Sequence, residues 1–504
     1  MNGPVSVQPM DAHNRALVAH VHPEDWVNPT PPATPYDMVV VGAGTAGLIT
    51  AIAAAGLGKR VALIERHLMG GDCLNVGCVP SKAILRAASA AAGLRAAGEF
   101  GIHVPGEARV DFAAVMERMR RLRAGIAPHD SAARYRDAGV DVYLGSGRFT
   151  AADTIDVAGA SLRFRRACIA TGARAGIPPI PGLDQVDALT NETLFELTEQ
   201  PARLAIIGAG AIGAEMAQAF ARLGSTVYLI EMSAGILPIE EPAAAAIVQE
   251  ALARDGVQLL LSSRDLTITG HEDGHARLAG EAADGPYAVD ADRVLVAAGR
   301  IPNTDGLGLD AAGVAFDRKG VRVDDHLRTT NPRIFAAGDI ASKYQFTHAA
   351  DAMARIVVRN ALFGLLPFKP KASKLVVPWC TYTTPEIAHV GAYPHELEEA
   401  GTRFETVTVD VADNDRAILE SETAGLLNVH VAPNGRILGA TLVSRHAGES
   451  IGEITQAMVH GLKLQKLASV IHPYPTQAEV IKRAADTWFK RWLLQWKDRI
   501  LFWK

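Results

Sequence analysis

Two cysteines stand close together in the stretch GGDCLNVGCVPSK, residues 70–82. Cys73 and Cys78 could bind a metal ion, form a structural disulfide, or form a bridge that is reduced and reoxidised. Structural zinc usually takes four ligands from two close pairs, whereas Cys168 and Cys380, the other two cysteines, stand in the apolar stretches ACIATG and VPWCTY. A structural bridge closing so short a loop would add only about 2 kcal/mol. The pattern therefore favours a redox pair, and we expect no resident metal site.

The residues after the pair predict where the thiols lie. GCVPSKAILRAASAAAG is typical of an alanine-rich helix that begins near Cys78. A thiol in or just before the first turn of a helix lies at the positive end of the helix dipole, which favours the thiolate. We therefore expect a reactive site at this helix N-terminus.

A βαβ pattern precedes the cysteines and recurs later in the chain. YDMVVVGAGTAGLITAIAAAGLGKRVALIE and LAIIGAGAIGAEMAQAFARLGSTVYLIE each contain an apolar run, a glycine turn, an alanine-rich helix and a second apolar run. Each copy carries G-x-G-x-x-G and then, at the same spacing, a glutamate: Gly42, Gly44, Gly47 and Glu65 in the first copy, and Gly208, Gly210, Gly213 and Glu231 in the second.

The repeated motif predicts two dinucleotide sites. Its glycines let the backbone approach a pyrophosphate, the helix N-terminus offers free N–H groups, and the carboxylate accepts hydrogen bonds from ribose hydroxyls. The alternative is a pair of glycine turns that bind no ligand, but two complete copies argue against it. Glu231 would pair with a free 2′-hydroxyl and repel a 2′-phosphate, so we expect NADH rather than NADPH at the second copy.

Composition restricts the other classes of function. The chain has 504 residues, of which 48% are hydrophobic. Its net charge of -5 argues against a general nucleic-acid binder, since such proteins carry an excess of Lys and Arg. The small number of cysteines favours a reducing compartment, and the sequence shows neither a signal peptide nor an apolar run long enough to span a bilayer. We expect a cytoplasmic protein that acts on small molecules.

Six motifs together resemble the flavin-dependent pyridine nucleotide disulfide oxidoreductases, the family of glutathione reductase, dihydrolipoamide dehydrogenase and mercuric reductase. They are GAGTAG, GGDCLNVGCVPSK, IATGA, GAGAIGAE, AAGRIPN and IFAAGDIA. The resemblance implies an α/β fold with two Rossmann-like domains, for FAD and for NAD(P)H, and a C-terminal α+β domain that forms a homodimer with shared active sites. The expected divisions are an N-terminal arm (1–35), an FAD domain in two parts (36–185 and 306–370), an NAD(P) domain (186–305), an interface domain (371–486) and a tail helix (487–504).

The resemblance also implies roles for individual residues. Cys78 matches the thiol nearest the flavin and Cys73 the outer thiol that exchanges with substrate. Lys82 and Glu215 match an ion pair beside the flavin ring, and Asp339 matches the residue that binds the ribityl chain. Further cofactor contacts are expected at Gly71, Asp72, Lys82, Thr171, Gly172, Gly299, Arg300 and Gly338.

The chain departs from the family pattern near its C-terminus. Disulfide reductases of the family carry H-P-T-x-x-E, whose histidine moves protons, but here the stretch is HPYPTQAE. Tyr474 takes the place of the histidine, Glu479 keeps its place, and His472 lies two residues upstream. An ordinary tyrosine titrates near pH 10 and is a poor proton carrier at neutral pH.

Tyrosine at this position resembles mercuric reductase, although no C-terminal cysteine pair follows Cys380. We expect a mercuric-reductase-like enzyme that reduces a metal ion or another acceptor. The alternative is a dihydrolipoamide-dehydrogenase-like enzyme that uses His472. Cys380 could pack in the core or serve as an auxiliary ligand.

The tail TWFKRWLLQWKDRILFWK is aromatic and basic. Trp488, Trp492 and Trp496 recur every four residues, as on one stripe of a helix. Such a helix could lie peripherally in a membrane interface, where the flavin would serve as an electron carrier for another protein, or it could dock on the protein's own dimer. The N-terminal arm predicts a short helix around DAHNRALVAHV, followed by proline-rich residues.

Overall fold

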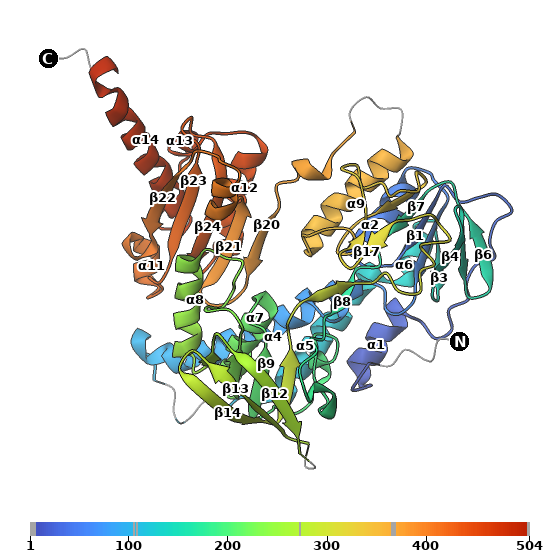
Figure 1. Ribbon diagram of the computed structural model, residues 1–504, viewed down its shortest axis with the longest axis horizontal. Helices are drawn as coiled ribbons and strands as arrows, with labels where there is room; N and C mark the ends of the chain where they lie inside the picture. The colour runs from blue at the N-terminus through green and yellow to red at the C-terminus, as the bar shows by residue number, and fades with distance from the viewer. Residues whose placement is uncertain (1–6, 104–105, 107–108, 272–273, 364–368, 501–504) are drawn as a thin grey trace.

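The structure is a computed structural model that describes residues 7–103, 106, 109–271, 274–363 and 369–500. Its three largest sheets form three layered regions, which Figure 1 shows at the right, at the lower centre and at the upper left. The α/β class with a C-terminal α+β region is confirmed.

The first region is a parallel five-stranded sheet in the order β19-β7-β1-β2-β3. Its strands are β1 (Met38–Val41), β2 (Val61–Glu65), β3 (Val140–Leu144), β7 (Ala167–Ile169) and β19 (Ile334–Ala336). Helices α2 (Thr45–Gly56) and α9 (Thr347–Leu362) pack together on one face (Figure 1). The antiparallel strands β4 (Arg148–Ala151), β5 (Thr154–Val157) and β6 (Ala160–Arg163) share a core with the sheet, and α6 (Ala132–Asp137) packs beside β3.

The second region repeats the βαβ unit. Its parallel sheet has the order β11-β10-β9-β15 and is made of β9 (Arg203–Ile207), β10 (Thr226–Ile230), β11 (Gln258–Leu260) and β15 (Arg293–Val296). Helices α7 (Ala211–Leu223) and α8 (Pro242–Arg254) belong to this region, with an antiparallel sheet of β12 (Arg264–Gly270), β13 (Ala276–Ala282) and β14 (Gly285–Ala291). Both predicted βαβ units are therefore confirmed.

Two helices and one strand pair join these regions. Helices α4 (Cys78–Ala96) and α5 (Phe112–Ile126) follow the short helix α3 (Gly71–Asn75), and α4 packs on both α5 and α7. Strand β8 (Ala173–Ala175), which follows β7, pairs antiparallel with β16 (Arg300–Pro302), which follows β15. The pair of β17 (Phe316–Asp317) and β18 (Gly320–Val321) belongs to the first region, where Val321 is buried. Helix α4, which begins at Cys78, thus contacts the second region through α7.

The third region is an antiparallel sheet in the order β20-β21-β24-β23-β22. Its strands are β20 (Pro378–Thr381), β21 (Glu386–Gly391), β22 (Glu405–Asp410), β23 (Leu426–Val431) and β24 (Ile437–Ser444). The helices are α10 (Pro394–Glu399), α11 (Asp415–Leu419), α12 (Ala447–Val459), α13 (Leu464–Leu467) and α14 (Glu479–Ile500). Among the described helices, none is both long and apolar enough to cross a membrane.

The N-terminal arm packs against the first region. The predicted helix is α1 (Ala12–Val21), and its side chains Leu17, Val18 and Val21 are buried in the same core as β1 and β2. Beyond the helix, the indole Nε1 of Trp26 donates to the Val142 carbonyl at 3.1 Å. The arm is thus a fixed part of this region.

Candidate active site

The two cysteines lie on consecutive short segments. Cys78 is the first residue of α4, which begins where the sequence predicted a helix. Cys73 lies in the middle of a separate short helix, α3, which the sequence did not predict. The chain turns sharply at Gly77, between the two segments. A Cβ at this position would lie 2.8 Å from the Asp72 carbonyl oxygen, so the turn requires glycine. Cys73 is half-buried and Cys78 is exposed. The local backbone therefore sets the two thiols side by side with one of them open to solvent.

The thiols interact with each other and with a hydroxyl. The hydrogen bond from Cys73 lowers the pKa of Cys78 to about 6, helped by Thr347 and by the charge of Lys82. The same hydrogen bond, with burial, raises the pKa of Cys73. Thr347, at the start of α9, lies 3.5 Å from the Cys78 sulfur. The site can therefore hold a thiolate at Cys78 and a proton at Cys73 at neutral pH.

An ion pair lies beside the thiols. Lys82 Nζ lies 2.8 Å from one Glu215 oxygen and 3.1 Å from the other. The Glu215 side chain is 5% exposed and that of Lys82 is 38% exposed. Tyr382 supports both partners, because its backbone N–H donates to Glu215 at 2.9 Å and its ring lies under the ammonium at 4.7 Å. A nearly buried carboxylate held in this way keeps a positive charge close to Cys78.

The first glycine loop is closed tightly. Gly42 has φ +101°, and a Cβ there would lie 2.4 Å from the Ala170 carbonyl oxygen. A Cβ on Gly47 would lie 1.8 Å from the Gly42 carbonyl oxygen. The Glu65 carboxylate accepts the Ala43 N–H at 2.7 Å, and burial raises its pKa. The loop leads into α2, whose first N–H groups have no side-chain cap.

The second loop has nearly the same geometry. Gly208 also has φ +101°, and a Cβ on Gly213 would lie 1.9 Å from the Gly208 carbonyl oxygen. The Glu231 carboxylate accepts the Ala209 N–H at 2.8 Å. Gly210 precedes α7, which likewise has no side-chain cap. Both loops therefore offer a helix N-terminus and a carboxylate to a dinucleotide.

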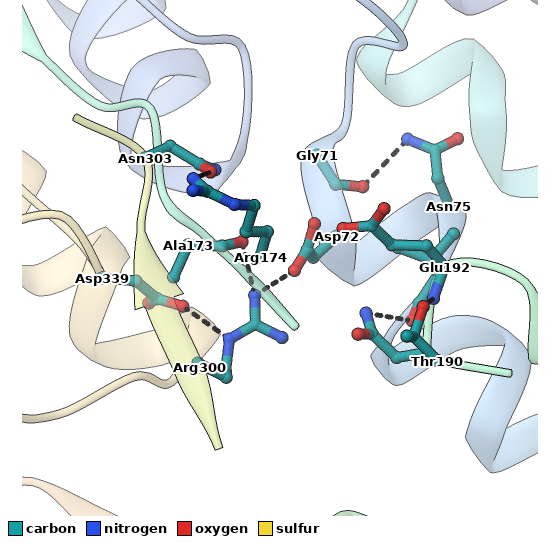
Figure 2. A network of polar contacts seen from close by, with 12 residues as sticks. Gly71, Asp72, Asn75, Ala173, Arg174, Thr190, Glu192, Arg300, Asn303 and Asp339 are labelled. Carbon is teal, nitrogen blue, oxygen red and sulfur yellow. Dashed lines mark hydrogen bonds and ion pairs between the residues drawn. The ribbon is translucent and has the colours of Figure 1, made fainter. Parts of the chain in front are cut away.

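A charged cluster joins α3 to the strand β16. Arg300 donates to Asp72 and, at 2.8 Å, to the Ala173 carbonyl, while its Nε lies 3.6 Å from an Asp339 oxygen (Figure 2). This Nε is buried and has no hydrogen-bond partner among the described residues. Burial raises the pKa of Asp339 to about 6.

The first glycine loop, together with Arg300 and Asp339, fits the FAD that this type of fold implies. Its glycines leave room for a pyrophosphate, and the free Arg300 donor beside Asp339 could receive the hydroxyls of a ribityl chain. Thr171 and Gly172 lie nearby, where the Thr171 hydroxyl donates to the Asn303 carbonyl at 2.9 Å. Gly172, Gly299 and Gly338 all have positive φ values, which only glycine adopts easily.

The C-terminal residues lie in the third region. The Tyr474 hydroxyl donates to Asp415 at 2.8 Å, and Tyr474 is 73% exposed. His472 is nearly buried, with Nε2 2.9 Å from Glu453. Glu479 begins α14 and lies 3.8 Å from Arg483. The described contacts of these three side chains are with their own region, so within one chain they do not meet the cysteine pair.

Cys380 lies close to the ion pair but faces the third region. Its sulfur is 3.9 Å from Glu386, and burial raises the pKa of its thiol. Burial also raises the pKa of Glu386 to about 7. Cys380 packs against the core of the sheet, while Cys168 is fully buried in β7.

Part of the tail packs on its own domain. Trp488 is 5% exposed and belongs to the core beneath α14. The side chains of Trp492 and Trp496 and residues 501–504 lie outside the described part of the chain.

Sequence reasoning missed several supporting residues. Tyr382 and Thr347 contact the ion pair and Cys78, and Asn303 binds the Thr171 backbone. Asp415 and Glu453 bind Tyr474 and His472. Asn303 and Tyr382 stood inside quoted stretches, AAGRIPN and VPWCTY, without being singled out. No local pattern connects Thr347, Asp415 or Glu453 to the residues that they contact.

Comparison with known proteins agrees with this geometry. The sequence profile described as "Pyridine nucleotide-disulphide oxidoreductase" matches residues 36–354, and the profile of its dimerisation domain matches residues 377–485. A mercuric reductase of Streptomyces lividans is 37% identical over 466 residues, which cover 90% of this chain and 96% of the relative. A dihydrolipoyl dehydrogenase of Chlamydia muridarum is 34% identical over 471 residues, which cover 89% and 96%.

A solved structure is also similar. The copper(II) complex of the HOCl-induced flavoprotein disulfide reductase RclA from Escherichia coli matches with a TM-score of 0.78 and 29% identity, covering 90% of this chain and 99% of that one. The chain therefore belongs to the FAD-dependent pyridine nucleotide-disulphide oxidoreductases and is an NAD(P)H-dependent oxidoreductase.

Proposed function

We propose that this enzyme passes electrons from NADH to a soft metal ion through Cys73 and Cys78. The observation that carries the choice of acceptor is Tyr474, which stands where disulfide reductases of the family have a histidine. Its hydroxyl is exposed and donates to Asp415, and this contact raises the pKa of Tyr474. Tyr474 is thus a poor proton carrier, and reduction of a metal ion does not require a residue that donates protons to the acceptor.

The residues of the first region would hold the cofactor. The glycine loop and α2 would receive the pyrophosphate, Glu65 the ribose, and Arg300 with Asp339 the ribityl chain. When bound, FAD accepts a hydride from the nicotinamide and releases electrons to a disulfide. Lys82 would hold positive charge near the thiolate, and Glu215 would fix the lysine.

The thiol chemistry balances without an added base. Opening the Cys73–Cys78 bridge takes two electrons and one proton, giving the Cys78 thiolate and the Cys73 thiol. Transfer of two electrons to one Hg(II) ion, or to two Cu(II) ions, closes the bridge and releases one proton. A disulfide acceptor that leaves as two thiols takes up two protons, of which closing the bridge supplies one. Tyr474 is poorly suited to deliver the other at neutral pH.

For the nicotinamide, we propose a preference for NADH. The Glu231 carboxylate follows β10 and is held by the N–H groups of Ala209 and Ser233, each at 2.8 Å. This leaves lone pairs for a ribose diol and places negative charge where a 2′-phosphate would lie. The dimerisation domain supports a homodimer, and we propose that the partner subunit's third region completes each active site.

The test is a comparison of acceptors. NADH-reduced holoenzyme would be mixed anaerobically with Hg(II), Cu(II), lipoamide, glutathione disulfide or a quinone, and reoxidation followed by absorbance. The proposal predicts that the metal ions reoxidise the enzyme fastest. Faster reoxidation by lipoamide or glutathione disulfide would contradict it.

A second candidate is a dihydrolipoamide-dehydrogenase-like activity. It is favoured by the His472–Glu453 contact of 2.9 Å, since a carboxylate can orient a histidine that moves protons. His472→Ala would then abolish lipoamide turnover, whereas on the metal proposal slow lipoamide turnover would be unchanged.

For the tail, we propose docking on the protein's own domain, because Trp488 packs in that core. Co-sedimentation of the full-length enzyme with anionic vesicles, lost in Lys490→Glu, would contradict this proposal and favour a peripheral membrane contact.

A further inference from the structure

The N-terminal arm contacts the segment that carries Cys73. The arm precedes residue 36, where the family profile begins. The Val21 carbonyl accepts the Met69 N–H at 3.1 Å, and His22 contacts the His67 carbonyl. Leu17 lies in the same buried cluster as Leu74, which is next to Cys73. The arm therefore supports the loop before α3 and the helix itself.

Two buried arginines on α5 depend on the arm for partners. Arg120 is 7% exposed and Arg123 is 2% exposed. Arg120 Nε lies 2.6 Å from Asp11, and Arg123 Nη2 donates to the Asn14 side-chain oxygen at 2.8 Å. Asn14 itself is fully buried. Buried cations need such partners, because leaving a charge without one inside a protein is costly.

Arg123 connects the arm to α3. Its Nη1 donates to the Asn75 carbonyl at 2.6 Å, at the last residue of α3. The Asn75 side chain in turn donates to the Gly71 carbonyl at 2.9 Å (Figure 2). It also donates to the Met69 carbonyl at 3.0 Å. One continuous set of hydrogen bonds therefore runs from Asn14 through Arg123 to both ends of the helix that holds Cys73.

We propose that Asn14 and Arg123 are positioning residues that hold α3 so that Cys73 stays against Cys78. The inference rests on the proposed role of these cysteines as the redox pair. Without Asn14, Arg123 would lose the partner that orients it toward the Asn75 carbonyl. The C-terminal end of α3 would then be held less firmly, although Arg300 still binds Asp72, and the Cys73 thiol would move more freely. The hydrogen bond that stabilises the Cys78 thiolate would then weaken, so the pKa of Cys78 would rise toward its ordinary value.

The test compares Asn14→Ala with a matched variant of the same arm. Asn28→Ala also removes two side-chain hydrogen bonds, those with the Leu144 backbone at 3.0 and 2.8 Å, but it lies on the β3 side, away from α3. Asn14→Asp keeps the acceptor for Arg123 and loses the donor to the Pro9 carbonyl, so it serves as the conservative variant if Asn14→Ala folds poorly.

Two readouts on the holoenzyme decide the matter. Hydrogen exchange of residues 70–76 should increase in Asn14→Ala but not in Asn28→Ala or Asn14→Asp. In the reduced enzyme, the midpoint for alkylation of Cys78, located by mass spectrometry, should rise by about one pH unit in Asn14→Ala alone. Equal exchange and equal midpoints in Asn14→Ala and Asn28→Ala would overturn the inference.

A different result would contradict the proposed function. If NADH does not open a Cys73–Cys78 bridge in the wild-type enzyme, the redox role is wrong, and this result is read before any variant is made. Hydrogen exchange of residues 70–76 still reports whether Asn14 holds α3 in that case.

Discussion

The two glycine loops share a backbone but differ in what surrounds them. Gly42 and Gly208 have the same φ of +101°, and each loop binds the glutamate at the C-terminal end of its second strand. In the first loop, Gly44 faces Gly71, whereas a Cβ on Gly210 would meet nothing within 4 Å. We infer that the first loop is a closed site for a resident cofactor and the second an open site for an exchangeable one.

The largest effect is expected for Cys78→Ser, which should block electron transfer to the acceptor but not reduction of the flavin by NADH. Cys78→Ser should reduce turnover with every acceptor that needs the dithiol by at least about 100-fold, because serine cannot form the bridge. Bleaching of the yellow absorbance by NADH should persist, since the second loop is intact. Stopped-flow absorbance measures both, and loss of bleaching together with turnover would contradict the separation.

A pair of glycine variants tests the closed and open loops. A Cβ on Gly71, at φ +58°, would lie 2.6 Å from the Gly44 Cα, so Gly71→Ala should cost about 2–4 kcal/mol and release FAD. Gly210→Ala meets no atom, so its free energy of unfolding should change by less than about 0.5 kcal/mol, while the KM for NADH rises.

Thermal unfolding and flavin content distinguish these outcomes. Equal loss of flavin in Gly71→Ala and Gly210→Ala would contradict the inference that only the first loop binds the resident cofactor.

The next effect concerns pH. Because the pKa of Cys78 is lowered to about 6, its thiolate is present above pH 6 and is lost as the pH falls through 6. The alkylation rate of Cys78 in the reduced enzyme should therefore fall about tenfold for each pH unit below 6. A midpoint near the ordinary cysteine value would contradict the proposed environment.

A smaller effect is expected at the second loop. Glu231→Gln should raise the KM for NADH by about tenfold, because an amide accepts fewer hydrogen bonds from the ribose hydroxyls. It should also reduce the preference for NADH over NADPH, because a neutral amide does not repel a 2′-phosphate. Flavin content serves as the control and should not change. An unchanged ratio of kcat/KM for the two nucleotides would show that another residue sets the preference.

The smallest effect is expected at Cys380. Cys380→Ser should change turnover with metal ions by less than about twofold if the residue only packs against the sheet. A larger loss, with the melting temperature unchanged, would favour the auxiliary-ligand alternative for Cys380.

Local patterns predicted the fold better than they predicted the contacts of the site. The two βαβ units and the position of Cys78 at a helix start follow from periodicity and glycine spacing, which act over a few residues. The contact of Arg300 with Asp72 joins residues far apart in the chain, and no short-range pattern encodes it. For the same reason, the sequence predicted an arm with a short helix but not the contact of Asn14 with Arg123.

The most direct test of the central claim is the state of two sulfurs before and after NADH. Oxidised holoenzyme would be alkylated under denaturing conditions, with and without prior anaerobic addition of one equivalent of NADH, and the labelled cysteines mapped by mass spectrometry. The account predicts that Cys73 and Cys78 are unlabelled before NADH and both labelled after it. Equal labelling of the pair in the two samples would contradict it.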